Sequence, residues 1–377
     1  MKIKCDNLDL ARAIGIAMRA VPSKANMQIC ESVLIEATNK GISVTANDMQ
    51  MGIETCFDGD VKEVGAIAVD AKLLNDISRK LPRGDVEISA SETLTVKIRC
   101  GRSKFEIPGQ DAEVFPRLPE PEQESVVTVD QESFKNAILN TIFCVAQTDR
   151  NVIMTGEYIE VKDDVMRISA LDGSRVATVK IHLAKEYGNI AAIVPAKTMS
   201  EVSKILRTGD MQVGFAKDHV IFSMENTTLV SRVIDGEYFN VDKILANDHK
   251  TIVKADAYEL LSCIGRASVV VESSQKRPVI INISDEVMNI DVNTQRGATH
   301  EELAIQKDGA DLLLGMNGQF LSDAIKAASF YDEEVEIRFI NAKSPATIEK
   351  VDSDYRYIVL PVSIRQGDTE NGNERSN

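Results

Sequence analysis

Apolar residues recur first at helical and then at alternating spacing within one stretch of the chain. From Asp70 onward they fall every three or four positions, as on one face of an amphipathic helix, and Asp70 itself is a good N-cap. After Gly84 they fall at every second position, which is typical of an antiparallel meander. The expected apolar helix face comprises Leu73, Leu74, Ile77 and Leu81. The stretch therefore predicts a strand, a basic amphipathic helix and a meander, in that order.

The same order of elements recurs twice more, at offsets of roughly 120 residues, which is about the size of a small domain. One copy begins at Ile193, with Pro195 at the expected first helical position, and a fainter copy begins at Leu312. The apolar set of the fainter copy is Phe320, Leu321, Ala324 and Ile325. We therefore expect an α+β fold of three structurally repeated domains. Their expected bounds are residues 1–125, 126–250 and 251–366, followed by a polar tail, residues 367–377, that we expect to be disordered.

Composition places the chain among ordinary soluble globular proteins, with 377 residues, 44% of them hydrophobic and 27% charged. No apolar run is long enough to cross a bilayer and the N-terminus lacks the apolar region of a signal peptide, so we expect a cytoplasmic protein without a membrane partner. The six scattered cysteines contain no CxxC pair and indicate reduced, mostly buried thiols. A net charge of -15 argues against coating nucleic acid by bulk attraction. Any nucleic-acid role must use a local basic surface.

No pattern in the sequence indicates catalysis. The four histidines lie far apart and lack the spacing of metal ligands, and no GxxxxGK[ST] or GxGxxG phosphate loop is present. The segment LDGSR lacks the flanking glycines of a nucleophile elbow, and its Asp172 is more simply a turn residue. The sequence favours a non-enzymatic binding protein with no cofactor and no metal.

Several segments, taken in order, resemble one known family. They are VLIEATNKGISVTANDMQMGIE, GAIAVDAKLLNDISRKLP, the FPRLP connector, MRISALDGSRVA, IVPAKTMSEVSKIL and the terminal YIVLPV. Together they make the chain resemble the bacterial sliding clamp, the beta subunit of DNA polymerase III, over nearly its whole length. The resemblance implies a head-to-tail homodimeric ring with helices lining a central hole and antiparallel sheets outside. It further implies that the ring slides on double-stranded DNA and acts as a processivity factor.

Lysines and arginines on the expected helices would face DNA phosphates in such a ring. Contacts of this kind position a protein on DNA without reading its sequence. Each residue could alternatively be a solvated surface charge. The main candidates are Lys24, Arg79, Lys80, Arg83, Lys197, Lys204, Arg207, Arg266 and Arg277, with Arg12, Arg19, Lys276 and Lys326 as further members.

The resemblance also implies a groove that binds short linear motifs of partner proteins. Expected partners are the DNA polymerase III catalytic subunit, the clamp loader complex, and other DNA polymerases and repair proteins. Methionine and branched aliphatic residues suit a pocket for a Leu or Phe anchor, and Arg175 and Lys243 could meet polar or acidic groups at the rim. The alternative is that the strand residues of this set are plain core. The matching positions are Met154, Leu171, Gly173, Ser174, Arg175, Val176, Phe239, Lys243, Ile244, Val359, Leu360, Pro361 and Val362.

Two of these positions, and Asn240 beside Phe239, depart from the family pattern. Many relatives have His at Ser174, Pro after Phe239 where this chain has Asn240, and Arg at Lys243. The groove is therefore expected to be present but reshaped.

The expected dimer contact joins the first domain of one subunit to the third of the other. Opposite charges on the two edges would favour head-to-tail pairing. The matching positions are Lys72, Arg102 and Lys104 on the basic edge, Val270 and Val271 as apolar contacts, and Glu301 and Glu302 on the acidic edge. These charges could also be ordinary surface charge. A paralogous scaffold that binds partner peptides without productive DNA loading remains the alternative function.

Overall fold

The computed structural model describes residues 1–24, 26–148, 150–244, 249–271, 277–328, 334–349 and 354–364. Lys276 and the expected tail, residues 367–377, lie outside the described residues. The chain forms two compact units, one of Met1–Lys135 with Leu183–Asp235, the other of Asn136–His182 with Gly236–Asn377.

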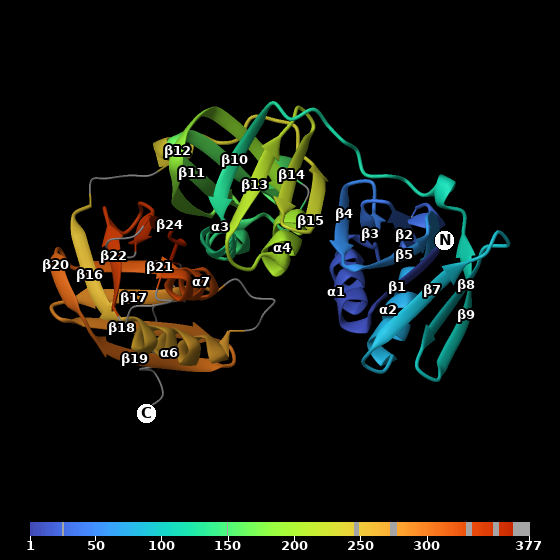
Figure 1. Ribbon diagram of the computed structural model, residues 1–377. Coiled ribbons are helices and arrows are strands. Elements are labelled where there is room, and N and C mark those ends of the chain that lie inside the picture. The colour runs from blue at the N-terminus through green and yellow to red at the C-terminus, as the bar shows by residue number, and fades with distance from the viewer. Residues whose placement is uncertain are drawn as a thin grey trace. The chain divides into compact units, whose positions relative to one another are not determined.

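Each repeat contains the predicted order of strands and helices (Figure 1). The first repeat comprises β1 (Lys2–Asp6), α1 (Asn7–Ala17), β2 (Ser32–Thr38), β3 (Gly41–Asn47), β4 (Met51–Phe57), β5 (Gly59–Glu63), β6 (Gly65–Asp70), α2 (Ala71–Lys80), β7 (Asp85–Ala90), β8 (Thr95–Cys100) and β9 (Ser103–Gln110). The second comprises β10 (Ser125–Asp130), α3 (Gln131–Leu139), β11 (Gly156–Leu171), β12 (Arg175–Pro195), α4 (Ala196–Ile205), β13 (Asp210–Phe215), β14 (His219–Met224), β15 (Thr227–Arg232) and the short α5 (Val241–Ile244). The third comprises β16 (Thr251–Asp256), α6 (Ala257–Ala267), β17 (Val279–Ser284), β18 (Val287–Thr294), β19 (Gly297–Ala304), β20 (Gln306–Gly309), β21 (Leu312–Met316), α7 (Gly318–Ala328), β22 (Glu334–Phe339), β23 (Ala346–Glu349) and β24 (Tyr355–Val359).

Aspartates cap the first helix of every repeat. Asp6, Asp130 and Asp256 each accept a hydrogen bond from a backbone N–H in the first turn, at distances between 2.7 and 2.8 Å. Such a bond satisfies one of the N–H groups that a helix leaves without an internal partner. Asp70 caps α2 in the same way, at 2.7 Å. Pro195 precedes α4 rather than occupying its first position, so this boundary was predicted one residue too early.

Helix α2 turns one predicted core residue outward. Leu74, Ile77 and Leu81 are buried as expected, but the side chain of Leu73 is 41% exposed. Helix α2 packs beside α1, which Figure 1 shows, and against β2 and β6. Because Leu73 lies about 100° around the helix from Leu74, it falls at the edge of this packed face.

The middle repeat shares one sheet with each neighbouring repeat. In the first unit β4 pairs antiparallel with β15, and in the second unit β12 pairs antiparallel with β24. A separate sheet of the third repeat has the strand order β19-β18-β17-β21. These two shared sheets explain why the division between the compact units runs through the middle repeat.

Candidate functional site

Two segments that are remote in the sequence, the turn between β11 and β12 and the end of β24, lie side by side in the second unit. Arg175 is the register partner of Val359. Beyond β24, the N–H of Leu360 donates to the carbonyl oxygen of Ser174 at 2.9 Å. The strand pairing therefore brings together two of the segments that carry predicted groove residues.

Asp172 and Gly173 shape the turn itself. Gly173 has a φ of +87°, in the left-handed region that glycine adopts readily. One carboxylate oxygen of Asp172 accepts from the N–H groups of Ser174 and Arg175, at 2.9 and 3.2 Å. Asp172 is thus the turn residue that the sequence indicated.

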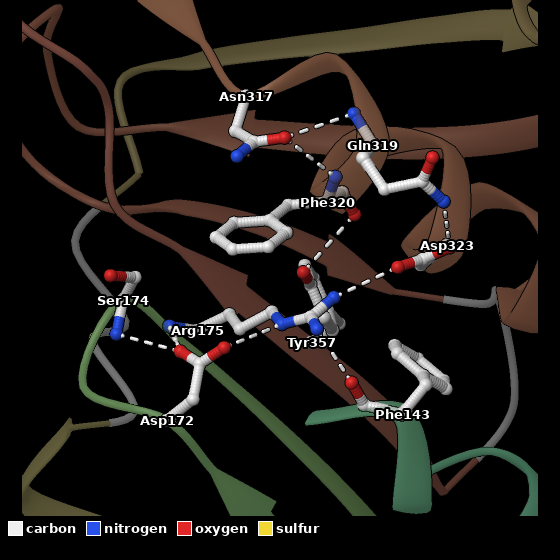
Figure 2. A network of polar contacts seen from close by, with 9 residues as sticks. All are labelled: Phe143, Asp172, Ser174, Arg175, Asn317, Gln319, Phe320, Asp323 and Tyr357. Carbon is white, nitrogen blue, oxygen red and sulfur yellow. Dashed lines mark hydrogen bonds and ion pairs between the residues drawn. The ribbon is translucent and has the colours of Figure 1, made fainter. Parts of the chain in front are cut away.

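Arg175 is the centre of a network of polar contacts (Figure 2). Its guanidinium donates to the carboxylates of Asp172 and Asp323, each at 2.9 Å, and to the carbonyl oxygen of Phe143 at 2.6 Å. The ring of Phe320 lies over the guanidinium, with its centroid 4.0 Å from Cζ. Because the side chain of Arg175 is only 10% exposed and its charge is balanced internally, it does not supply the free rim cation expected from the sequence. It holds the turn and α7 together.

The start of α7 is fixed by the same network (Figure 2). Asn317 caps the helix by accepting from the N–H groups of Gln319 and Phe320, at 3.0 and 3.1 Å. The Gln319 amide donates to Asp323 at 2.7 Å, and the Tyr357 hydroxyl donates to the Phe320 carbonyl at 3.1 Å. Phe320 was predicted as part of the apolar helix face, but it covers Arg175 instead. Sequence reasoning missed this network, apart from Arg175.

The predicted groove residues divide into a buried floor and an exposed surface. Leu171, Val176 and Val359 are 3%, 7% and 0% exposed, so the alternative interpretation as core describes these three better. Phe239, Leu360 and Val362 are 37%, 44% and 36% exposed and offer apolar surface to a ligand. Gly173, Ser174 and Lys243 are also exposed, and Met154, Ile244 and Pro361 are half-buried.

The connector that carries Phe239 is held by aromatic packing and a helix cap. Tyr238 stacks on Tyr158, with ring centroids 4.6 Å apart and planes at 9°, and meets Phe239 edge-on. The side chain of Asn240 accepts from the N–H of Lys243 at 3.1 Å and so caps α5. Asn240, which the sequence marked as a departure from the family pattern, therefore has a local structural role.

Glu157, at the start of β11, is a fully buried acid. One carboxyl oxygen lies 2.5 Å from the Thr141 hydroxyl, and the other has no hydrogen-bond partner among the described residues. Burial raises the pKa of Glu157 from 4.5 to about 8. This group stays protonated at neutral pH.

The predicted DNA-contact residues differ in whether a nearby carboxylate neutralises their charge. Lys197 pairs with Asp48 at 2.6 Å, Lys204 with Glu201 at 2.7 Å, and Arg266 with Glu301 at 2.9 Å. Arg277 is half-buried and directly follows residues outside the described set. Within the part of the chain that the structure describes, no ion pair involves Lys24, Arg79, Lys80, Arg83 or Arg207, all of them exposed. Arg207 lines a cavity of about 290 Å³ together with Arg12.

The predicted dimer residues lie on β9, β19 and nearby elements. Lys72, Arg102, Lys104 and Glu302 are exposed, and Val270, Val271 and Glu301 are half-buried. Two further apolar residues of these elements are exposed, namely Phe105 of β9 at 38% and Val269 at 73%. The alternation of apolar residues after Gly84 includes Phe105 and predicts that it is buried, so this prediction is wrong.

The described residues contain no candidate metal site and no candidate membrane-spanning helix. No group of three or more His, Cys, Asp or Glu side chains there could hold a metal ion. No helix of that part of the chain is long and apolar enough to span a bilayer.

Three family models match the chain in order. They are the N-terminal, central and C-terminal domains of the DNA polymerase III beta subunit, matching residues 1–119, 128–240 and 242–363. The matches follow one another along the chain without overlap.

Full-length relatives agree with these matches. The beta sliding clamp of Halalkalibacterium halodurans is 28% identical over 356 residues, covering 89% of this chain and 92% of the relative. A solved DNA polymerase III beta subunit from Eubacterium rectale is 38% identical with a TM-score of 0.92, covering 96% of this chain and 99% of that one. The DNA polymerase sliding clamp of Bacillus subtilis is 26% identical, also with a TM-score of 0.92, over 97% of this chain and 100% of that one.

Proposed function

The chain belongs to the DNA polymerase III beta subunit family, and from this premise we propose how it works as a DNA sliding clamp. It is a non-catalytic, cytoplasmic accessory subunit whose three clamp domains span residues 1–125, 126–250 and 251–366. Two copies close into a ring around double-stranded DNA and tether the polymerase. The observation that carries this proposal is the repeat itself, because its two junctions within the chain follow one rule.

The rule concerns which strands meet where one repeat ends and the next begins. At the first junction Thr55 of β4 faces Thr227 of β15. At the second, Val179 of β12 faces Tyr355 of β24, with the same antiparallel direction. In the first repeat the fourth strand, β4, thus pairs with β15, the last strand of the second repeat. In the second repeat β12 is the counterpart of β4, and it pairs with β24, the last strand of the third repeat. Applied once more, the rule joins β19 to β9 of a second copy.

Among the described strands, both β19 and β9 have an edge without a pairing partner. Strand β19 is the outermost strand of its sheet, and residues 103–108 of β9 pair only with β8 among the described strands. Phe105 supports the assignment. Its counterparts in the repeat, Leu229 and Tyr357, are both 0% exposed at the filled junctions, whereas Phe105 is 38% exposed. A head-to-tail contact that covers Phe105 and closes after two subunits makes a ring.

Phe105→Glu is expected to raise the dissociation constant of the dimer by at least roughly 30-fold, because an aromatic anchor is lost and a charge is buried at the contact. Sedimentation velocity over a dilution series measures the monomer fraction. Val64→Glu, which changes another exposed apolar residue (57% exposed), is the matched control and should leave the dimer intact. Equal dissociation constants for Phe105→Glu and the unaltered chain would remove β9 from the interface.

We further propose that DNA is held loosely by cations on the helices and loops. The cations that have no carboxylate partner among the described residues contribute most, namely Lys24, Arg79, Lys80, Arg83 and Arg207. The paired cations Lys197, Lys204 and Arg266 contribute less, because each would have to exchange a nearby carboxylate for a phosphate. Topological retention by the ring makes weak contacts sufficient.

The groove in the second unit is the proposed docking site for partner motifs. A Leu or Phe anchor would contact the exposed apolar side chains Phe239, Leu360 and Val362 above the buried floor. Lys243 rather than Arg175 would meet acidic groups of the ligand, since the charge of Arg175 is already balanced. Proposed partners are the polymerase catalytic subunit, the clamp loader, and other polymerases and repair proteins.

The test of function uses nicked circular DNA and a clamp loader, with bound protein counted before and after the circle is cut. We expect protein to be lost through the new ends, because a ring is retained by topology. Protein that stays equally bound to linear DNA would contradict encirclement. A dimer that never loads would instead favour a peptide-binding scaffold.

A further inference from the structure

A histidine lies at the free edge of the third repeat. His300 is exposed on β19, and its Nδ1 lies 2.7 Å from a carboxylate oxygen of Asp291 on β18. Because a carboxylate only accepts hydrogen bonds, Nδ1 carries the proton. In the neutral ring Nε2 is therefore an acceptor.

The repeat determines what His300 would face in the dimer. In the β3–β4 hairpin Glu54 lies opposite Thr45, and in the β18–β19 hairpin His300 lies opposite Asp291 at the same distance from the turn. His300 is thus the counterpart of Glu54. At the first junction Glu54 pairs with Thr228.

The same comparison of hairpins identifies Lys104 as the residue of β9 that corresponds to Thr228 of β15. The β14–β15 and β8–β9 hairpins both have two-residue turns, closed by Met224 with Thr227 and by Cys100 with Ser103. Lys104 follows Ser103 as Thr228 follows Thr227. In the proposed dimer His300 would therefore lie directly opposite Lys104 of the partner subunit.

We propose that pH controls the strength of the dimer through this pair. The inference rests on the proposed ring dimer. When His300 is neutral, its Nε2 accepts a hydrogen bond from the ammonium of Lys104 in the partner subunit. When His300 is protonated, Nε2–H faces that ammonium, the hydrogen bond is lost and two cations repel each other. The dimer therefore weakens as pH falls.

Other charged groups near His300 influence its protonation in both the free chain and the dimer. Asp291 faces it from β18, and Glu302 follows it on the same face of β19. On the opposite face of β19, Glu301 is paired with Arg266 of α6. In the free chain the hydrogen bond and charge of Asp291 raise the pKa of His300 above 6.5.

Across the contact, the partner would add further charges beside its Lys104. Arg102 lies in the two-residue turn before β9, Glu106 lies on the same face of β9 as Lys104, and Arg99 lies opposite Lys104 on β8. Lys97 is paired with Glu106 at 3.9 Å. The partner's edge is thus mainly positive where it meets His300, which lowers the pKa of His300 in the dimer. The free chain holds a proton that the dimer releases, and by linkage acid favours dissociation, by up to about tenfold per pH unit for each contact.

The experiment mixes donor-labelled and acceptor-labelled chains and measures energy transfer over a dilution series at pH 8 and pH 6. The dissociation constant of the unaltered chain should rise at least about tenfold from pH 8 to pH 6. His300→Gln, which cannot titrate, should reduce this change to under about threefold, and Lys104→Gln should do the same by removing the repelling charge. His182→Gln is the matched control, since His182 also lies by a carboxylate, Asp354 at 3.1 Å, but outside the contact.

The outcomes separate this inference from the ring itself. A dimer whose dissociation constant is the same at both pH values overturns the pH switch and leaves the ring proposal intact. Retention of the full change by His300→Gln or Lys104→Gln also overturns it. A chain that is monomeric at pH 8 overturns both the ring and the switch.

Discussion

Arg175→Met is expected to lower the free energy of unfolding by about 3–5 kcal/mol, because it leaves two carboxylates without their cation. Asp172 and Asp323 are only 17% and 21% exposed, so water cannot fully replace the guanidinium. The ring of Phe320 loses its cation as well. Chemical denaturation followed by circular dichroism measures the change. We also expect weaker binding of the polymerase catalytic subunit, since the turn at Ser174 and the start of α7 lose their common support.

A triple variant separates lost charge balance from lost packing. Arg175→Met combined with Asp172→Asn and Asp323→Asn removes both carboxylate charges and keeps similar volumes. Most of the lost stability should return, because a buried ion pair can be replaced as a whole at little cost. If Arg175→Met alone changes the unfolding free energy by less than about 1 kcal/mol, the network is not a buried ion cluster.

The sequence predicted the elements that local chemistry determines. Asp70 caps α2 as predicted because the chemistry of a cap depends on residues within one turn. The tripled order of strand, helix and meander was likewise readable from periodicity alone.

Partners remote along the chain could not be predicted in this way. Arg175 and Asp323 are 148 positions apart, and only the pairing of β12 with β24 brings them together. The alternating pattern of Leu171, Val176 and Val359 fits both a core and a groove floor. Exposed surface, which only the fold determines, decides between the two.

Glu157→Gln is expected to remove a stability loss that the unaltered chain shows between about pH 4.5 and pH 8. The Thr141 hydroxyl has one proton but lies 2.8 Å from the Ala137 carbonyl and 2.5 Å from Glu157. A carbonyl cannot donate, so the protonated acid supplies the second hydrogen bond. The ionised alternative would be a buried charge with one hydrogen bond and an unpartnered oxygen, which is costly.

The direction of the pH effect follows from the two pKa values of Glu157. Between 4.5, the ordinary value, and about 8 in the folded chain, the folded state holds a proton that the unfolded state has lost. The contribution of Glu157 is fully present below pH 4.5, falls by up to about 1.4 kcal/mol per pH unit above it, and is gone above pH 8. Glutamine keeps an N–H donor for Thr141 and does not titrate.

Denaturation at a series of pH values gives the difference in unfolding free energy between Glu157→Gln and the unaltered chain. That difference cancels the contributions of all other titrating groups, and it should grow in favour of the variant up to about pH 8 and then level off. Glu132→Gln changes an exposed glutamate and should give a flat difference. A flat difference for Glu157→Gln would mean that the acid is ionised in the folded chain. The connector through Tyr238 and Phe239 would then lie near a buried negative charge at neutral pH, because Glu157 interacts electrostatically with Tyr238.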